Sequence, residues 1–503
     1  MSYLKHRIQK PWTCGLLLIA LTPLAGWAQA DNAPAPPPQS TGAVDQTTGE
    51  SQPAEQTTPP PAFGMGAAVT SPNENPPVSG LDQPSLEPGA ITRSFLAAGA
   101  ILSESGDSNI EGSFGSGRLG PGGVTRAMGT VSLQKIWSRY ETDLQYIGGG
   151  AFYEAVNHNA DQLHQAEFAQ RAIWRTGQLV FRDSVSYLPE GAFGSGSYGG
   201  SGALQSSLTG LHIAAGGISA GPGSALGGNF SADQFGSISH RPRLTNSATA
   251  DLVEAVTPRS SFTLAGSYGF VHFTDNPEGL IDSNQTVAEF GYDHQINRTD
   301  QLAVSYGFQN FSFPQIAASS VRTNTVNLIY GHRITGRIDV VLAAGPQFTA
   351  IYSPLFGSSH RISANGNAKL RYRFQRASLQ LEYKHHNTNG SGYFLGSDTD
   401  SGAISILRPL GRVWETSSDI GVANNKRIVS AATTVPATSD LYLYAGGAVH
   451  RHIGRRYRLF LSYQYNRLSF DESISQVTGS GRISTRHMGA LGIEWYPRPV
   501  RLD

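Results

Sequence analysis

The stretch Lys369–His386, KLRYRFQRASLQLEYKHH, decides the fold because both of its halves alternate between apolar and polar side chains. Successive side chains of a strand point to opposite faces, so each half has one aliphatic and aromatic face and one charged face. Each half is long enough to cross a bilayer as a tilted strand, which takes about 9–11 residues. If the register were flipped, Arg371 and Arg373 would face lipid, at roughly 2–4 kcal/mol each near the midplane. The stretch therefore predicts a hairpin of a transmembrane β-barrel that is apolar outside and polar inside.

The composition of the whole chain is consistent with one large barrel. Only 15% of the 503 residues are charged, and 58 glycines accompany 28 prolines. Soluble domains have about 25% charged residues, and a barrel needs an apolar side chain only at every second position. The formal net charge is zero, which argues against nucleic-acid binding. Cys14 is the only cysteine, so neither a disulfide framework nor a thiolate metal site is expected.

Residues 1–30 have the three parts of a secretory signal peptide: basic residues, an apolar run at 16–21 and the small-residue site Ala28-Gln29-Ala30. An N-terminal anchor is the alternative, but the apolar run is shorter than the ~18 residues of a spanning helix. Residues 31–90 hold 13 of the 28 prolines and almost no large apolar side chains. They predict a disordered periplasmic linker, which either reaches peptidoglycan or a periplasmic partner or serves only as a spacer.

From residue 92 onward, alternating segments are separated by short turns that each carry an arginine, and by longer polar connections. Between Arg259 and Arg376 these arginines recur every 39 residues, which indicates a repeated unit of two strands, one tight turn and one longer loop. The pattern predicts an all-β, antiparallel, up-and-down barrel over residues 91–503 with about 18 strands, 16 being the alternative. The first strand is expected at 92–104 and the last at 482–496. An even strand number puts both ends of the barrel in the periplasm.

Tryptophan and one long loop give further indications. Beyond the signal peptide, the four tryptophans fall beside predicted short turns or at the end of the last strand, which predicts an interfacial girdle of Trp137, Trp174, Trp414 and Trp495. The loop 189–240 is rich in Gly and Ser but contains several leucines and isoleucines. We expect it either to fold inward as a constriction or to form an external flap. Asp183 is an exception to the pattern, because it falls on the outward face, so either the register differs there or a bulge or an oligomer contact shields it.

The same alternation identifies the side chains that face the lumen. Basic ones concentrate on the hairpin 369–386, and acidic ones on the segments 140–153 and 284–296, so the two sides are expected to orient polar solutes in a transverse field. The alternative is that these charges form ion pairs in a plugged interior. The expected pore-lining residues are Arg171, Arg333, Lys369, Arg371, Arg373, Glu382, Lys384, Arg458, Glu141, Asp143, Glu289, Asp293 and Asp339.

Overall, residues 92–503 resemble the porin-like β-barrels of Gram-negative outer membranes, in architecture and not through a family-specific motif. The resemblance implies export to the outer membrane, contact with its lipid and passive diffusion of small polar solutes through the lumen, with a homo-oligomer as an option. The alternative function is an outer-membrane component or scaffold of an exopolysaccharide or secretion system. Gly217–Gly221 matches G-x-S-x-G, but the strand-to-helix turn of that motif is missing, so no enzyme is expected. His450 and His452 share a face without a third ligand, so neither a metal nor a cofactor is expected.

Overall fold

The computed structural model describes most of residues 94–502. The expected signal peptide at 1–30, the linker at 31–90 and the loop 189–240 all lie outside the described residues. The described ranges are 94–108, 122–154, 161–188, 243–257, 259–274, 280–297, 299–316, 319–335, 337–354, 357–374, 377–390, 392–411, 413–429, 437–454, 456–472 and 482–502. Among them, no helix is long and apolar enough to cross a bilayer.

The described chain forms eighteen long strands and a final two-residue strand, so the predicted number of spanning strands is confirmed. The first strand begins three residues later than expected, at Phe95, and most other ends agree within three residues. The strands are β1 Phe95–Asp107, β2 Gly122–Ile136, β3 Tyr140–Tyr153, β4 Asp161–Ile173, β5 Gly177–Leu188, β6 Arg243–Thr257, β7 Ser260–Phe273, β8 Ser283–Gln295, β9 Asp300–Phe313, β10 Ser319–Thr335, β11 Ile338–Ser353, β12 Gly357–Arg373, β13 Ser378–Thr388, β14 Ser397–Leu410, β15 Trp414–Arg427, β16 Ser439–Ile453, β17 Tyr457–Phe470, β18 Ile483–Trp495 and β19 Val500–Arg501.

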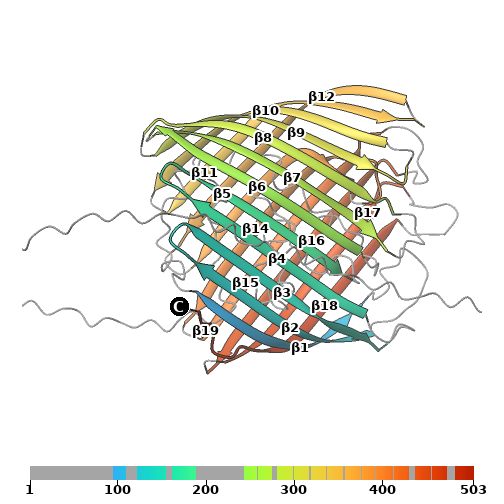
Figure 1. Cartoon of the computed structure of the whole chain (residues 1–503). Helices are drawn as coiled ribbons and strands as arrows, with labels where there is room; N and C mark the ends of the chain where they lie inside the picture. The colour runs from blue at the N-terminus through green and yellow to red at the C-terminus, as the bar shows by residue number, and fades with distance from the viewer. Residues whose placement is uncertain are drawn as a thin grey trace, which may run out of the picture. The chain divides into compact units, whose positions relative to one another are not determined.

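The sheet closes on itself as an antiparallel up-and-down barrel (Figure 1). Each strand pairs with its neighbours in sequence, and β1 pairs with β18 from Ala100↔Trp495 to Asp107↔Met488. The short strand β19 extends this closing seam by pairing with Phe95 and Leu96. Closure leaves no free edge for pairing with another chain. An even number of strands, with short turns at one end and longer loops at the other, is the architecture of bacterial outer-membrane barrels.

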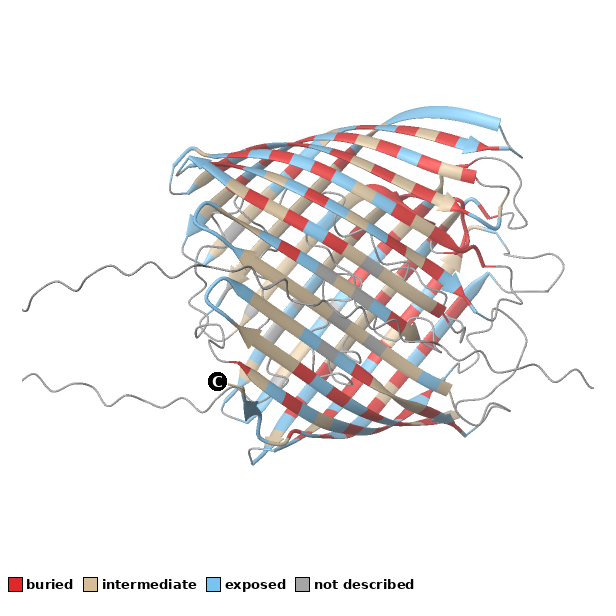
Figure 2. Ribbon diagram, in the orientation of Figure 1, coloured by how far each residue is buried: buried red, intermediate tan, exposed pale blue. Residues whose placement is uncertain are grey.

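Side chains alternate between the two faces of the wall, as Figure 2 shows by the banding along most strands. In the hairpin 369–386, Leu370 pairs with Leu381 on the outer face, and Lys369 pairs with Glu382 on the inner face. The outer face carries large exposed apolar side chains, such as Leu102, Leu328 and Leu461, all over half exposed. The inner face carries buried polar and charged ones. This is the distribution that a bilayer outside and a polar interior require.

One seam of the wall is incomplete at the loop end. β12 and β13 pair only from Gly366↔His385 to Arg373↔Ser378, while β12 stays paired with β11 along its whole length. Beyond Gly366 the two hairpins separate: β12 residues 357–362 are exposed, and the described residues of 386–399 are all buried (Figure 2). The β13–β14 hairpin therefore bends into the barrel while the β11–β12 hairpin stays in the outer wall.

Candidate functional site

The lumen-facing charges of β3 and β4 form a local ion pair. Arg171 Nη1 lies 3.5 Å from Glu141 Oε2, and both side chains are half-buried. Gln134 Nε2 donates to Glu141 Oε1 at 3.0 Å, and Arg171 Nη2 donates to Gln178 Oε1 at 2.9 Å. Asp143 lies on the same inner face, two residues along β3. These charges are thus part of a hydrogen-bonded band on the wall near the short turns.

A second group of charges lies on β12 and β13. Lys384 Nζ contacts Glu382 Oε1 at 2.7 Å, and Lys369 faces Glu382 across the strand pair. Arg371 is in register with Asp339, which is in register with Arg333, so a cross-strand row of alternating charge runs over β10, β11 and β12. For Arg373 and Asp339, the structure describes the backbone only.

The charges at the closing seam are fully buried. Arg458 forms an ion pair with Glu494, and Tyr496 donates its hydroxyl to Glu494 Oε2 at 2.7 Å. Arg458 also lies over the Tyr496 ring, with its guanidinium carbon 5.6 Å from the ring centroid. A second pair, Arg486 with Asp107, joins β18 to β1, with Arg486 Nε donating at 2.8 Å. Sequence reasoning did not single out this second pair, because the two residues meet only when the barrel closes.

The acidic residues of β8 have different surroundings. Asp293 is buried and accepts a hydrogen bond from the backbone N–H of Ser261 at 3.0 Å, and another from its hydroxyl. Glu289 is also buried and lies in one cross-strand row with Ala265 and with Asp251 of β6. The inner face of β6–β8 therefore has a carboxylate-rich patch. The structure brings the predicted lumen residues together as separate neighbouring groups on several strands.

The feature that the sequence analysis missed is the loop between β13 and β14, residues 389–396, which we call the crossing loop. On one side, the Ile281 N–H donates to the Gly392 carbonyl at 2.8 Å, and Asn389 Nδ2 donates to Ser283 Oγ of β8 at 3.0 Å. On the other side, Tyr393 packs edge-to-face on Phe470 of β17, with ring centroids 5.3 Å apart. β8 and β17 are nine strands apart (17 − 8), which is half of the eighteen-strand ring. The crossing loop therefore connects opposite walls at the loop end of the lumen.

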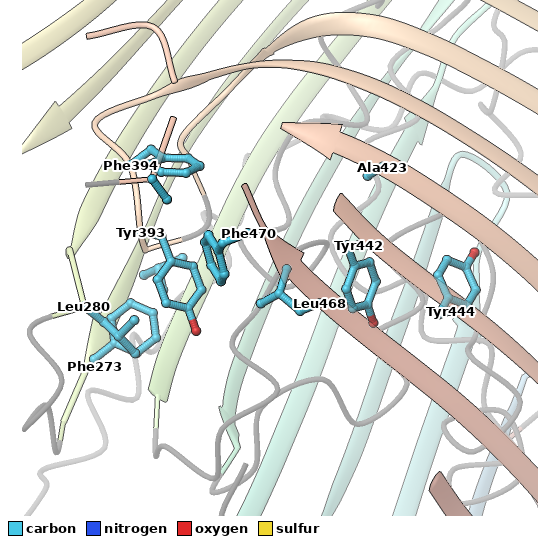
Figure 3. Close-up of a cluster of buried hydrophobic side chains, with 11 residues drawn as sticks. Phe273, Leu280, Tyr393, Phe394, Ala423, Tyr442, Tyr444, Leu468 and Phe470 are labelled. Atoms are coloured by element: carbon cyan, nitrogen blue, oxygen red, sulfur yellow. The ribbon is translucent and has the colours of Figure 1, made fainter. Parts of the chain in front are cut away.

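Apolar side chains hold the crossing loop in this position. Tyr393 and Phe394 belong to a buried cluster that also takes in Phe273, Leu280 and Phe470, as Figure 3 shows. Leu395 belongs to a second buried cluster, with Phe311 and Phe313 of β9. Burying an aromatic or leucine side chain contributes about 1.5–3 kcal/mol relative to exposure. Three such side chains stabilise an inward position for a loop that would otherwise be solvated.

Glycine makes the tight course of the crossing loop possible. Gly390, Gly392 and Gly396 all have φ near +80°, a region that other residues rarely adopt. At Gly390, a Cβ would also lie 2.3 Å from the Phe394 carbonyl oxygen. The N–H groups of Tyr393 and Phe394 both donate to the Gly390 carbonyl at 3.0 Å, which closes the turn.

Hydrogen bonds anchor the strand ends on either side of the crossing loop. Asn387 Nδ2 lies 3.0 Å from Thr323 Oγ1 and 2.7 Å from Thr349 Oγ1, so it ties β13 to the inner faces of β10 and β11. The hydroxyl groups of Thr388 and Thr399 form a hydrogen bond of 3.0 Å across the hairpin. Arg361 pairs with Asp398 across the incomplete seam. In the sequence, the crossing loop is marked by the apolar triplet Tyr393-Phe394-Leu395 between glycines, just as leucines and isoleucines among Gly and Ser mark the loop 189–240.

The four tryptophans lie at the short-turn end of the barrel. Trp137 and Trp174 directly follow β2 and β4, and Trp414 and Trp495 are terminal residues of β15 and β18. All four are exposed. Trp174 Nε1 donates to Glu254 Oε2 at 2.8 Å, and the Arg451 guanidinium carbon lies 5.2 Å from the Trp414 ring centroid. Polar partners beside exposed indole rings suit a membrane–water interface.

Asp183 lies on the outer face of β5, in register with Phe168. Neither strand pair of β5 shows a register shift at this position, so no bulge turns the carboxylate inward. Asn246 Nδ2 of β6 donates to Asp183 Oδ1 at 2.8 Å. The Asn246 side-chain amide therefore provides a hydrogen bond to one carboxylate oxygen of Asp183 on the lipid-facing side of the wall.

No protein-family model matches the sequence, and neither does any curated protein. Among solved structures, the chain is similar to OccK2 (OpdF) of Pseudomonas aeruginosa in complex with glucuronate, with 9% identity, a TM-score of 0.40, and coverage of 82% of this chain and 98% of that one. It is similar to the outer membrane protein OpdK of the same organism, with 11% identity, a TM-score of 0.40, and coverage of 81% and 100%. It is also similar to the FrpB iron transporter of Neisseria meningitidis, with 8% identity, a TM-score of 0.39, and coverage of 81% and 70%. At these scores, none of those proteins' solutes is carried over to this chain.

Proposed function

We propose that the protein is an outer-membrane channel for the passive diffusion of small polar solutes. The observation that carries the proposal is the closed eighteen-strand wall, apolar on its outer face and lined inside by charged and polar side chains. Barrels of this strand number enclose an aqueous channel unless a segment fills them. Polar groups on the inner face replace part of a solute's hydration shell, and the outer face matches lipid.

The crossing loop is the proposed size-selecting element. It joins β8 to β17 at the loop end, so a solute that enters from outside has to pass beside Tyr393 and Phe394. A fixed apolar obstacle in a polar channel restricts passage by steric exclusion and by raising the cost of removing water from the solute. The contribution of 189–240 to this constriction remains a prediction from the sequence.

Swelling of liposomes that contain the full chain tests this proposal. We expect liposomes with wild-type protein to swell in isosmotic solutions of neutral solutes, with a rate that falls as solute size increases. The double substitution Tyr393→Ser and Phe394→Ser removes the apolar contacts of the crossing loop and should raise the rates for the larger solutes several-fold. The matched control changes the same two residue types on the outer face of β11, Phe348→Ser and Tyr352→Ser, and should leave size selectivity unchanged. Equal rates for solutes of every size, or none above empty liposomes, would exclude a selective channel.

The alternative function, an export component, is favoured by the same crossing loop if the loop closes the lumen at rest. A secretion conduit has to be shut until its substrate arrives, and an apolar cluster across one mouth is a suitable closure. Planar-bilayer recordings separate the two functions. Steady current from wild-type protein supports the diffusion channel. Silence that changes to current only in the Tyr393→Ser, Phe394→Ser variant supports the exporter.

A further inference from the structure

The charged row of Arg333, Asp339 and Arg371 lies near the short turns, and toward the loop end the same side of the lumen has a lining of amides and a hydroxyl. Its residues are on four consecutive strands, β9 to β12, and face inward by the same alternation that buries their neighbours. Five of the six are at most 2% exposed, and the sixth, Asn367, is half-buried. We call this surface the amide wall, and it consists of Gln309, Thr325, Asn327, Gln347, Asn365 and Asn367.

The register brings these side chains into adjacent rows. Thr325 of β10 pairs with Gln347 of β11, which pairs with Ser363 of β12. In the next row toward the short turns, Gly345 of β11 is in register with Asn365 of β12. Gly345 has no side chain, and a Cβ there would lie 1.7 Å from the Val326 carbonyl oxygen and 2.9 Å from Asn327 Oδ1, so the backbone of β10 and the Asn327 side chain approach this glycine closely. The wall is thus a continuous polar surface with a glycine at its centre.

Most polar atoms of the amide wall lack a hydrogen-bond partner within the described part of the chain. These atoms are Gln309 Nε2 and Oε1, Thr325 Oγ1, Asn327 Oδ1, Gln347 Oε1, Asn365 Nδ2 and Oδ1, and Asn367 Oδ1. A buried polar group without a partner is destabilising. Eight such atoms side by side would be a large destabilisation relative to the marginal stability of a typical domain. Partners for these atoms have to come from water, from a bound solute or from parts of the chain outside the described residues.

The chemistry of the wall specifies the class of partner. Side-chain amides donate and accept hydrogen bonds, a threonine hydroxyl does both, and none of the six side chains carries a charge. Sugar hydroxyls have the same dual capacity, and a neutral solute needs no counter-charge in a buried site. Formal charges border the wall: Lys369 follows Asn367 by two residues on the inner face of β12, Lys384 pairs with Asn367, and Glu289 lies two strands from Thr325 in its row. The wall therefore favours neutral polyhydroxylated molecules over ions.

The amide wall also lies next to the anchor of the crossing loop. Gln309 is in register with Thr323, which is in register with Thr349, and Asn387 bonds to both threonines. His386, buried beside Asn387, has two ring nitrogens without a hydrogen-bond partner in the described part of the chain. The charged pairs and apolar side chains around Arg458 and Phe460 lie on other strands. A solute that passes the crossing loop along β9–β12 therefore meets the amides first.

We propose that the amide wall is a binding site for neutral saccharides, which would make the channel selective for sugars over ions of similar size. This proposal rests on the proposed diffusion channel for its transport consequence, but the binding site itself does not. Several weak hydrogen bonds in successive rows give a site that a sugar can enter and leave, which is what conduction requires.

The test uses the full chain in liposomes and compares three solutes: glucose, sucrose and the gluconate anion. The triple substitution Gln309→Met, Asn327→Leu and Asn365→Leu keeps side-chain size and removes the amides. We expect it to slow glucose and sucrose entry about tenfold and to change gluconate entry less than twofold. Gln464→Met is the matched control, because Gln464 is a buried amide on the inner face of β17. It should leave all three rates within twofold of wild type.

Four outcomes bear on the proposal. Unchanged sugar entry in a folded triple variant would overturn it, and so would equal slowing of sugars and gluconate. If the triple variant does not fold, the isosteric Thr325→Val variant is tested in its place. It should slow the entry of sucrose two- to fivefold and leave the entry of the other solutes unchanged. If wild-type protein passes no solute, the diffusion function fails. The binding site is then judged by saturation-transfer NMR of sucrose with the detergent-solubilised chain, where no transfer, or transfer that the triple substitution leaves intact, would exclude it.

Discussion

Arg458 shows how this barrel holds a charge inside its wall. The side chain is 2% exposed, its ion-pair partner Glu494 is completely buried, and Tyr496 bonds to both. An ion pair taken out of water gains little net stability, but removing one partner leaves an uncompensated buried charge. Arg458 therefore fastens β17 to β18 beside the closing seam and presents little charge to a solute.

Substitution of Arg458 should be costly, and the cost should depend on Glu494. We expect Arg458→Met to lower the free energy of unfolding by about 3–5 kcal/mol, because it leaves the Glu494 carboxylate buried and unpaired. Adding Glu494→Gln should recover most of that loss. Guanidinium unfolding of the three variants in detergent measures both effects. Equal stability of Arg458→Met and wild type would show that the pair is solvated in the membrane.

Asp471, just after β17, gives a residue-scale prediction on pH. Its partial burial alone would raise the pKa of the carboxyl, but hydrogen bonds from Thr438 outweigh this effect and lower the pKa below 3.8. A lowered folded-state pKa stabilises the contact above the unfolded value, and the stabilisation is lost as pH falls through the folded-state pKa.

The measurement is the melting temperature of wild type and Asp471→Asn as a function of pH. Wild type should be the more stable at pH 6, and the gap should shrink as pH falls below about 4, where carboxylates begin to protonate. The control Glu472→Gln should follow wild type. A gap that is constant with pH would mean that the carboxylate does not act through its charge.

At the scale of elements, the β13 side of the β13–β14 hairpin has two attachments to the wall, eight residue pairs with β12 near the short turn and side-chain contacts toward the loop end, while β14 is paired with β15 along its whole length. Between them the ladder is open, and Arg361 reaches across it to Asp398. Because the hairpin carries the crossing loop, movement of the hairpin would change the width of the mouth.

Breaking the Arg361–Asp398 pair should therefore loosen the crossing loop. We expect Arg361→Gln to increase the frequency of current fluctuations between open levels in planar bilayers, with little effect on folding, because Arg361 is partly solvated. Arg322→Gln is the control, since Arg322 is an exposed arginine of β10. Identical noise in wild type and Arg361→Gln would show that other contacts hold the hairpin.

The elements also explain which parts of the fold could be predicted. Strand ends follow from local alternation and short turns, so the strand Tyr140–Tyr153 coincides with the segment 140–153 identified from the sequence. The crossing loop could not be located in the same way. Its triplet Tyr393-Phe394-Leu395 is visible in the sequence, but its partners Leu280, just before β8, and Phe470 of β17 are distant in the sequence, and only barrel closure brings them together.

At the scale of the whole barrel, alternation gives the direction of a side chain but not its partner. Alternation predicts an inward direction for both Glu141 and Arg171, but their ion pair depends on the register between β3 and β4. Most of the described charged pairs join neighbouring strands or residues of one strand, with the β12–β14 pair Arg361–Asp398 as an exception, so much of the charge is balanced along the wall. The amide wall was not predicted from the sequence, because its residues are neutral, are spread over four strands and do not contribute to a charge pattern.

The central claim is a wall with lipid on one side and water on the other, and two adjacent residues of β14 test it directly. Ala403 faces inward in register with Glu382, and Ile404 faces outward in register with Leu381. With Cys14 changed to serine, Ala403→Cys and Ile404→Cys are each placed in liposomes and treated with a charged maleimide or with nitroxide-labelled lipid. We predict that the maleimide modifies the cysteine at 403 and not at 404, and that lipid nitroxides quench a fluorophore at 404 only. The reverse pattern, or equal labelling of both positions, would contradict the account.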